Sequence, residues 1–251
     1  MERIRNWRIY RPILSWRIAR EIGRWTSADE AAKEFYKELV QPGGLVFDVG
    51  ANLGKRTKVF LRLQAQVVAV EPQPACVRVL QLAFGRRAVI IPQALAATEG
   101  EGEIRIDDSS TISSMSEDWI LAVKASGRFA THRWGRTERI RTTTLDRLIE
   151  MYGEPSFVKI DVEGYEYEVL RGLSRPIQCL SIENTPEQVK MTEKCLEHLA
   201  KLGKIELNYS FGETMQWVFP KWMSIEEMTR FLEHVGQSQE EGQGDVYVRY
   251  R

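Results

Sequence analysis

The sequence predicts an α/β fold in which helices cover both faces of a doubly wound, mostly parallel sheet. Short apolar runs typical of buried strands alternate with segments of helical spacing over most of the chain. This alternation is typical of strand–helix–strand units, whose strands run parallel. The first run, residues 45–49, ends abruptly at Gly50, as the first strand of a nucleotide-binding sheet does.

The expected elements follow one another in a regular order. A helix is expected over residues 27–39, with Ser27 as its N-cap and Glu30 at the capping-box position. The core strands are expected at 45–49, 67–70, 88–91, 157–161, 177–182, 205–211 and 245–250, with added strand segments at 102–106 and 139–142. The other helices are expected after Gly54, at 74–84 and 145–152, after Gly164, and at 188–202 and 224–234. Two parts result: a helical arm, 1–40, and a ligand-binding domain, 41–251.

Composition excludes several classes of protein. The 251 residues are 43% hydrophobic, enough for a substantial core, and 35 basic residues balance 35 acidic ones. Because this balance gives no global attraction to nucleic acid, we expect no nucleic-acid partner. Cys76, Cys179 and Cys195 lack metal or redox spacing, which indicates buried thiols in a reducing compartment. With no membrane-spanning apolar run and no signal peptide, the expected location is the cytoplasm.

Residues 1–25 form a distinct segment in which seven arginines alternate with tryptophans and aliphatic residues. Pro12 interrupts this segment, so we do not expect one continuous helix. Two interpretations stay open. The segment lies on an anionic membrane surface, as a peripheral contact at the inner face, or it docks its tryptophans on the domain or on a second subunit of a homo-oligomer.

The turn after the first expected strand has the composition of a ligand cradle. Gly50 permits a positive φ and a close approach of the backbone to a ligand, and Asn52 is a residue type that tolerates the same region. The dinucleotide fingerprint fits badly, because Asn52 and Lys55 occupy its second and third glycine positions. Asp48, two residues before Gly50, would repel a pyrophosphate but suits a cationic ligand.

A second acid is expected at the tip of the next strand. Glu71 follows the turn by about twenty residues, which is the position from which a carboxylate accepts both ribose hydroxyls. Two acids and few phosphate donors indicate an adenosine cofactor with a cationic tail and no phosphate. S-adenosylmethionine matches this description.

Several motifs, in order from residue 45 to the C-terminus, make the chain resemble the FkbM family of methyltransferases. They are Asp-Val-Gly-Ala-Asn-Leu-Gly at 48–54 with Thr57, Glu71-Pro72, Thr-Leu-Asp at 144–146, Lys-Ile-Asp-Val-Glu-Gly-Tyr-Glu at 159–166, Val-Leu-Arg-Gly at 169–172 and Gly-Asp-Val-Tyr at 244–247. The resemblance implies the class I methyltransferase fold, a Rossmann-like sheet of seven core strands with the last one antiparallel. It also implies a hydroxyl acceptor on a sugar, a glycan or a polyketide-like small molecule.

The expected cofactor site combines the motifs with residues at neighbouring strand tips. Its members are Asp48, Gly50, Asn52, Gly54, Thr57, Glu71, Pro72, Gln93, Ala94 and Asp161. The backbone near Gln93 and Ala94 is expected to face the adenine, the alternative being an ordinary strand exit. Asp161, at the end of the fourth core strand, is expected beside the reacting methyl group.

Methyl transfer to a hydroxyl requires removal of a proton, and two routes fit the sequence. In the first, Asp161, Glu163 or His132 acts as general base. In the second, Mg²⁺ or Mn²⁺ bound by Asp161, Glu183 and Asn184 lowers the pKa of the hydroxyl. This ligand set resembles that of metal-dependent catechol O-methyltransferases and macrolide-sugar O-methyltransferases. Alternatively, Glu183 only orients the site or holds an arginine.

Residues 108–138 are expected to form an irregular substrate loop. The loop is rich in serine and also carries Trp119, Phe129, His132, Arg133 and Trp134. A tryptophan beside arginines could stack on a sugar ring and bind an acidic group, while the alternative is a solvated loop whose aromatic residues pack locally. Elsewhere, Lys159 is assigned no role, and the carboxylates of Glu166 and Glu168 are expected on a solvated helix face.

Three functions are consistent with parts of the sequence, to different degrees. The first is an S-adenosylmethionine-dependent methyltransferase, O-methylating or else N-methylating a small molecule. The second is a nicotinamide-dependent oxidoreductase, which the failed glycine fingerprint and Asp48 oppose. The third is a non-catalytic, cofactor-binding partner subunit that docks through its tryptophan-rich arm.

Overall fold

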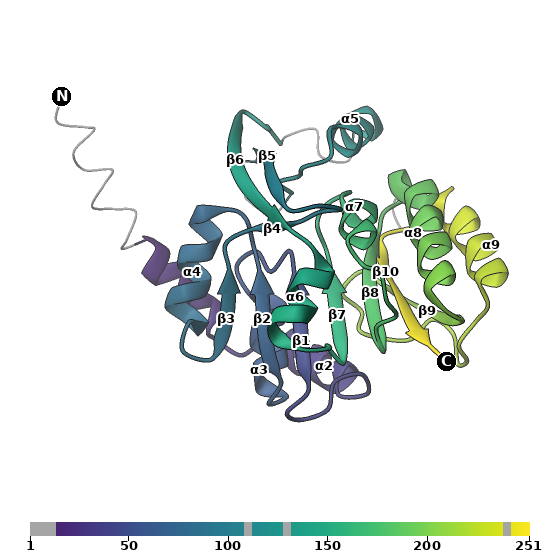
Figure 1. Cartoon of the computed structure of the whole chain (residues 1–251), viewed down its shortest axis with the longest axis horizontal. Helices are drawn as coiled ribbons and strands as arrows, with labels where there is room; N and C mark the ends of the chain where they lie inside the picture. Colours follow the sequence, from purple (N-terminus) through teal and green to yellow (C-terminus); the bar gives the residue numbers. More distant parts are fainter. Residues whose placement is uncertain (1–13, 108–111, 128–131, 238–241) are drawn as a thin grey trace.

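A seven-stranded sheet forms the centre of the protein (Figure 1). The structure is a computed structural model and describes residues 14–107, 112–127, 132–237 and 242–251. The strand order is β3-β2-β1-β7-β8-β10-β9. All neighbours pair parallel except β10, which is antiparallel to both β8 and β9. The predicted doubly wound, mostly parallel sheet with an antiparallel last strand is confirmed.

The strands of this sheet are short and buried, as apolar runs predict. They are β1 (Leu45–Val49), β2 (Gln66–Val70), β3 (Ala88–Ile91), β7 (Phe157–Ile160), β8 (Cys179–Asn184), β9 (Ile205–Phe211) and β10 (Gly244–Tyr250). Successive side chains point to opposite faces of the sheet. Val46 therefore joins one buried cluster with Phe60 and Phe157, while Phe47 joins a second cluster on the other face.

Helices cover both faces. They are α2 (Ser27–Tyr36), α3 (Lys55–Arg62), α4 (Pro74–Phe84), α6 (Leu145–Tyr152), α7 (Glu166–Arg171), α8 (Val189–Leu202) and α9 (Ile225–Gly236), with a 3₁₀ turn at Pro186–Gln188. Helices α6, α7, α8 and α9 contribute to the cluster that contains Phe47. Helices α2 and α3 pack on the opposite face, and α4 packs Leu80 and Phe84 against Ala69 of β2.

A second, smaller sheet lies above the carboxyl ends of the parallel strands (Figure 1). Its order is β4-β6-β5, formed by β4 (Ala94–Leu95), β5 (Gly100–Ile106) and β6 (Arg136–Thr143). Beside it stands α5 (Glu117–Ser126), where an irregular loop was expected. That expectation was wrong for these ten residues, because Ser116 caps the helix, Gly127 ends it, and Trp119, Ile120 and Val123 form its buried side.

The N-terminal arm is described from residue 14 onward, and Pro12 lies outside the described residues. Residues 14–22 are helical and leave Leu14 and Trp16 more than half exposed. Ile22 packs against the cluster formed by Ala51, Ala69, Leu80 and Phe84. The cap of α2 is Thr26 with Asp29, one residue before the expected pair. Among the described residues, no helix has the length and apolar content needed to cross a bilayer.

Candidate active site

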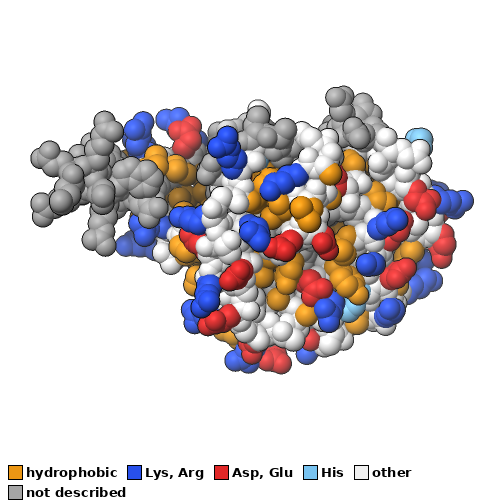
Figure 2. Space-filling model, turned by 90° about the horizontal axis from the view of Figure 1, so that it is seen from above, with side chains coloured by type: hydrophobic (Ala, Val, Ile, Leu, Met, Phe, Trp, Pro, Cys, Tyr) orange, Lys and Arg blue, Asp and Glu red, His pale blue; other side chains and the backbone are white. Residues whose placement is uncertain are grey.

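A cavity of about 440 Å³ opens at the carboxyl ends of β1, β2, β7 and β8. The loops that follow these strands supply most of its walls, and Ser113 and Met115 close it from the segment before α5. Ile22 of the N-terminal helix also lines it. Seen from this end of the sheet, acidic and hydrophobic side chains lie together near the middle of the face, with Lys and Arg around them (Figure 2).

The floor of the cavity is the turn between β1 and α3. Gly50 has φ +80°, and a Cβ built there would lie 1.8 Å from the carbonyl oxygen of Asp161. The turn is held to β2, because the N–H groups of Gly50 and Ala51 both donate to the carbonyl oxygen of Val70 at 3.0 Å. Asn52 has φ +47°, so this turn uses the left-handed region twice, as expected from its residue types.

Two buried carboxyl groups flank the turn. Thr57 Oγ1 donates to Asp48 Oδ2 at 2.5 Å, and burial raises the pKa of Asp48 above its ordinary value. Glu71 accepts from the backbone N–H groups of Asn52 at 2.8 Å and Gln73 at 2.7 Å. Burial raises the pKa of Glu71 to about 7. These bonds fix both carboxyl groups at the edge of the cavity.

Most of the residues expected to bind a cofactor line this cavity. Those that do are Asp48, Gly50, Asn52, Glu71, Pro72, Gln93, Ala94 and Asp161. Gly54 and Thr57 are not among the described lining residues. Gly54 is the N-cap of α3, has φ +90° and lies close to the ring of Phe84. Thr57 donates a hydrogen bond to Asp48 and so holds its carboxyl group in place. These two residues position the turn.

A cluster of three carboxylates occupies the other end of the cavity. Asp161 follows β7, Glu163 lies two residues further on, and Glu183 is near the end of β8. One carboxylate oxygen from each lies within 4.8 Å of the other two. Glu183 Oε1 accepts from Gln243 Nε2 at 2.9 Å, whereas Glu183 Oε2 is buried without a hydrogen-bond partner among the described residues. Burial, followed by the charge of Asp161, raises the pKa of Glu183 well above its ordinary value.

Two other candidates lie elsewhere. Asn184 is fully buried, and its Oδ1 accepts from Thr192 Oγ1 at 2.8 Å on the side of α8. His132 Nδ1 lies 3.0 Å from Asp107 Oδ2, and in the described part of the chain His132 does not line the cavity. The structure therefore brings Asp161, Glu163 and Glu183 together but not Asn184 or His132.

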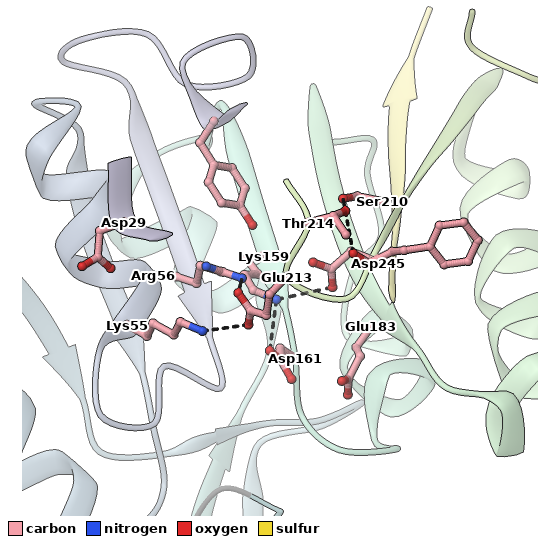
Figure 3. Close-up of polar contacts among 12 residues, drawn as sticks. Asp29, Lys55, Arg56, Lys159, Asp161, Glu183, Ser210, Glu213, Thr214 and Asp245 are labelled. Carbon is pink, nitrogen blue, oxygen red and sulfur yellow. Dashed lines mark hydrogen bonds and ion pairs between the residues drawn. The ribbon is translucent and has the colours of Figure 1, made fainter. Parts of the chain in front are cut away.

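Lys159 belongs to the site, although its sequence position suggested no role. Its side chain is 4% exposed, and its Nζ lies 3.0 Å from Asp161 Oδ2 and 3.5 Å from Asp245 Oδ1 (Figure 3). The two carboxylates raise the pKa of Lys159 well above its ordinary value against the opposing effect of burial. This buried ammonium joins the ends of β7 and β10 and fixes the orientation of Asp161.

The expected solvated position of Glu166 was wrong. Its side chain is buried and accepts from the N–H groups of Val162 at 3.0 Å and Gly164 at 3.3 Å. It therefore holds the loop that carries Glu163, whose backbone has φ +54°. Burial raises the pKa of Glu166 to about 7. The only sequence signal was its place one turn after the strand, which is also typical of a helix-capping acid.

The tryptophans of the expected substrate loop pack locally. Trp119 is 3% exposed, and its ring meets that of Trp134 edge to face at 6.3 Å. Trp134 also lies under the ammonium group of Lys124 and donates from Nε1 to Ile112 O. Trp119 is therefore not available to stack on a sugar ring. Phe129 lies outside the described residues.

The charges of the cavity suit a cationic ligand. Its lining contains six carboxyl groups and three basic groups, and the basic groups are paired. Lys55 and Arg56 both contact Glu213, at 3.0 and 2.6 Å, and Lys159 contacts Asp161 (Figure 3). Carboxyl groups therefore outnumber basic groups among the described lining residues, which suits a sulfonium nucleoside better than a pyrophosphate, since like charges repel at close range.

One curated protein resembles the chain over part of its length. The chain is 28% identical over 148 residues to the hexuronic acid methyltransferase AglP of Haloferax volcanii. The match covers 57% of this chain and 56% of AglP, so the chain spans little more than half the length of that curated relative.

Solved structures that resemble the chain are distant. A precorrin-6y C5,15-methyltransferase from Geobacter metallireducens has a TM-score of 0.45 and 10% identity, over 89% of this chain and 86% of that one. An O-methyltransferase from Bacillus cereus in complex with SAH also has a TM-score of 0.45 and 10% identity, over 94% and 90%. The Methyltransferase FkbM domain matches residues 48–238, which is most of the chain. The chain therefore belongs to the FkbM methyltransferase family.

Proposed function

We propose that this methyltransferase uses S-adenosylmethionine to methylate a hydroxyl oxygen of an acidic sugar or glycan. The observation that carries the proposal is the arrangement of acids at the two ends of one cavity. Asp48 and Glu71 flank the glycine turn, where a nucleoside fits. Asp161, Glu163 and Glu183 lie at the other end, where a hydroxyl proton has to be accepted.

The cofactor supplies a methyl group on a sulfonium, and the acceptor oxygen bonds to that carbon as the carbon–sulfur pair of electrons returns to sulfur. Glu71 would accept the two ribose hydroxyls, and Asp48 would lie near the positive end of the nucleoside. Gln93 and Ala94 would border the adenine. The cavity itself would exclude water and align the acceptor with the methyl group.

The acceptor's proton has to leave toward the cluster of carboxylates. Asp161 is held in one orientation by Lys159 and is the more exposed partner, with a side chain 36% accessible against 4% for Lys159. It is therefore placed to contact an acceptor directly. A nearby carboxylate supports a hydroxyl group as the acceptor, because a hydroxyl proton needs a base. The experiment below also includes sugar amines as acceptors.

A second cavity, of about 470 Å³, supports an acidic acceptor. It lies between α4 and β6, shares Pro72 with the first cavity, and is lined by Arg78, Arg139 and Arg141. Among the described residues, none of these three side chains has an ion pair, and Glu101 is the one acidic residue of the lining. Guanidinium groups suit carboxylates, and the relative AglP is named for a hexuronic acid, a sugar that carries one.

The direct test is methyl transfer from labelled S-adenosylmethionine to hexuronic acids, neutral sugars, sugar amines and extracted glycans, with mass spectrometry of the product. We expect an O-methylated acidic product. In Asp161→Asn, turnover is expected to fall by about a hundredfold or more, while affinity for S-adenosylhomocysteine changes by less than about threefold, since the lost base serves the acceptor. An N-methylated product would contradict the hydroxyl. Full biological activity of Asp161→Asn would instead favour a non-catalytic partner subunit.

The arginine-lined cavity gives a separate prediction. Replacing Arg139 and Arg141 together by Ala should raise KM for an acidic glycan about tenfold, because two charged contacts are lost, and should leave kcat nearly unchanged. Arg147→Ala is the matched control, since this exposed arginine of α6 pairs with Glu150 and lies outside both cavities. Equal KM values in all three proteins, at low and high salt, would remove this cavity from acceptor binding.

A further inference from the structure

The N-terminal helix, residues 14–22, reaches the cavity from outside the family domain, which begins at residue 48. The helix lies beside α4 (Figure 1), where Ile22 packs against the cluster that contains Leu80 and Phe84. Ile22 also lines the cavity, together with Asn52 and Leu53 of the turn after β1. A residue that precedes the family domain therefore forms part of the wall of the candidate active site.

Contacts with α3 hold the end of the N-terminal helix in place. Lys58 Nζ donates to the carbonyl oxygen of Arg24 at 2.9 Å and pairs with the buried carboxylate of Asp29 at 2.7 Å. The guanidinium carbon of Arg62 lies 5.4 Å from the centroid of the Trp25 ring. Because α3 begins directly after the glycine turn, these contacts fix the N-terminal helix relative to that turn.

The exposure of Ile22 suits contact with a ligand. Ala19, three residues earlier on the same helix, is 7% exposed and already anchors the helix. Ile22 is only half-buried, and its aliphatic side chain borders the cavity. Asp48 and Glu71 offer carboxyl groups to the charge and the hydroxyls of a nucleoside, whereas Ile22 offers an apolar surface. Burial of such a surface under a flat ring is favourable.

We propose that Ile22 binds the adenosine part of S-adenosylmethionine and that the N-terminal helix closes the cavity over it. The inference rests on the proposed function in one respect, namely that this cavity holds the cofactor. The cofactor and the helix then stabilise each other, because a ligand favours the state of the protein in which it makes more contacts.

The first test is calorimetric titration of the whole chain with S-adenosylhomocysteine. Ile22→Ala is expected to raise the Kd about five- to tenfold, because the variant lacks most of the apolar surface that the nucleoside covers. Ile22→Leu should stay within about twofold of the wild type, since it keeps the apolar volume. Ile18→Ala is the matched control: Ile18 is half-buried on the same helix, and in the described part of the chain it does not line the cavity.

The second test measures how firmly the helix is held. Trypsin can cut after Arg17 and Arg20, which are exposed, and mass spectrometry of the released N-terminal peptides gives the rate. Saturating S-adenosylhomocysteine should slow this cleavage about threefold or more in the wild type and in Ile18→Ala, and clearly less in Ile22→Ala.

The outcomes separate this inference from the proposed function. Equal Kd values in Ile22→Ala and the wild type, or equal rises in Ile22→Ala and Ile18→Ala, would overturn the role of Ile22 and leave the cofactor site intact. Cleavage of the wild type at the same rate with and without S-adenosylhomocysteine would overturn the closure by the helix. Failure of the wild type to bind S-adenosylhomocysteine would overturn both the inference and the proposed function.

Discussion

Gly50→Ala is expected to abolish cofactor binding and to lower the free energy of unfolding by at least about 4 kcal/mol, the range of severe steric changes in a core. A Cβ at this position would lie 1.8 Å from the carbonyl oxygen of Asp161 and 2.8 Å from its carbonyl carbon. Both are backbone atoms, so no side-chain rotation relieves the clash. The ends of β1 and β7 would have to separate, and the cavity lies between them.

Gly43→Ala is the matched control. Gly43 has φ +79°, close to the +80° of Gly50, but a Cβ there meets no atom within 4 Å. This variant therefore carries only the cost of a left-handed alanine, about 1 kcal/mol. Chemical denaturation and calorimetric titration with S-adenosylhomocysteine measure both effects. Similar losses in the two variants would show that the close approach of β1 to β7 is unimportant.

Glu71→Gln is expected to weaken S-adenosylhomocysteine binding by about 10- to 100-fold, because a carboxylate accepts both ribose hydroxyls more strongly than an amide does. Glu103→Gln, an exposed position on β5, serves as the control. Calorimetric titration at pH 8 gives the comparison directly. Equal affinity in the wild type and Glu71→Gln would remove Glu71 from the cofactor site.

The same carboxyl group predicts a pH dependence. Burial raises the pKa of Glu71 to about 7. Binding requires the ionised form, so wild-type affinity should rise from pH 6 to pH 8, by about tenfold for each unit below the pKa. The free energy of unfolding should change with pH in the opposite direction to the affinity. Because burial raises the pKa of Glu71, the folded protein holds this proton more tightly than the unfolded chain does. The contribution of Glu71 to the free energy of unfolding therefore falls as the pH rises from about 4.5 to about 7. Both slopes should be smaller in Glu71→Gln.

The residues that line the cavity beside Gly50 could be predicted from the sequence because their determinants are local. The turn after residues 45–49 needs glycine because the backbone there has a positive φ, and Asn52 tolerates a positive φ as well. The position of Glu71 follows from the lengths of the one helix and the one strand that separate it from the turn. The doubly wound, mostly parallel sheet followed from the regular alternation of elements. Each of these depends on neighbours within about thirty residues.

The end of the cavity that carries Asp161, Glu163 and Glu183 depends on contacts that no local pattern encodes. The buried ammonium of Lys159 contacts Asp245, which lies 86 residues later in the sequence on β10, with β8 between the two strands in the sheet. Glu166 is buried because it bonds to the loop in front of its own helix. The sequence alone could have shown that Glu183 and Asn184 do not serve the same site. Successive residues of a strand point to opposite faces of the sheet, so only one of the two can face the cavity.

We infer that the cavity beside Gly50 and Glu71 holds the methyl donor. A crystal structure of the chain soaked with S-adenosylhomocysteine tests it most directly. We predict one molecule in this cavity, with its ribose hydroxyls on Glu71, its adenine beside Gln93 and its sulfur on the side of Asp161. An empty cavity at saturating ligand, or the nucleoside bound at another surface, would contradict the account.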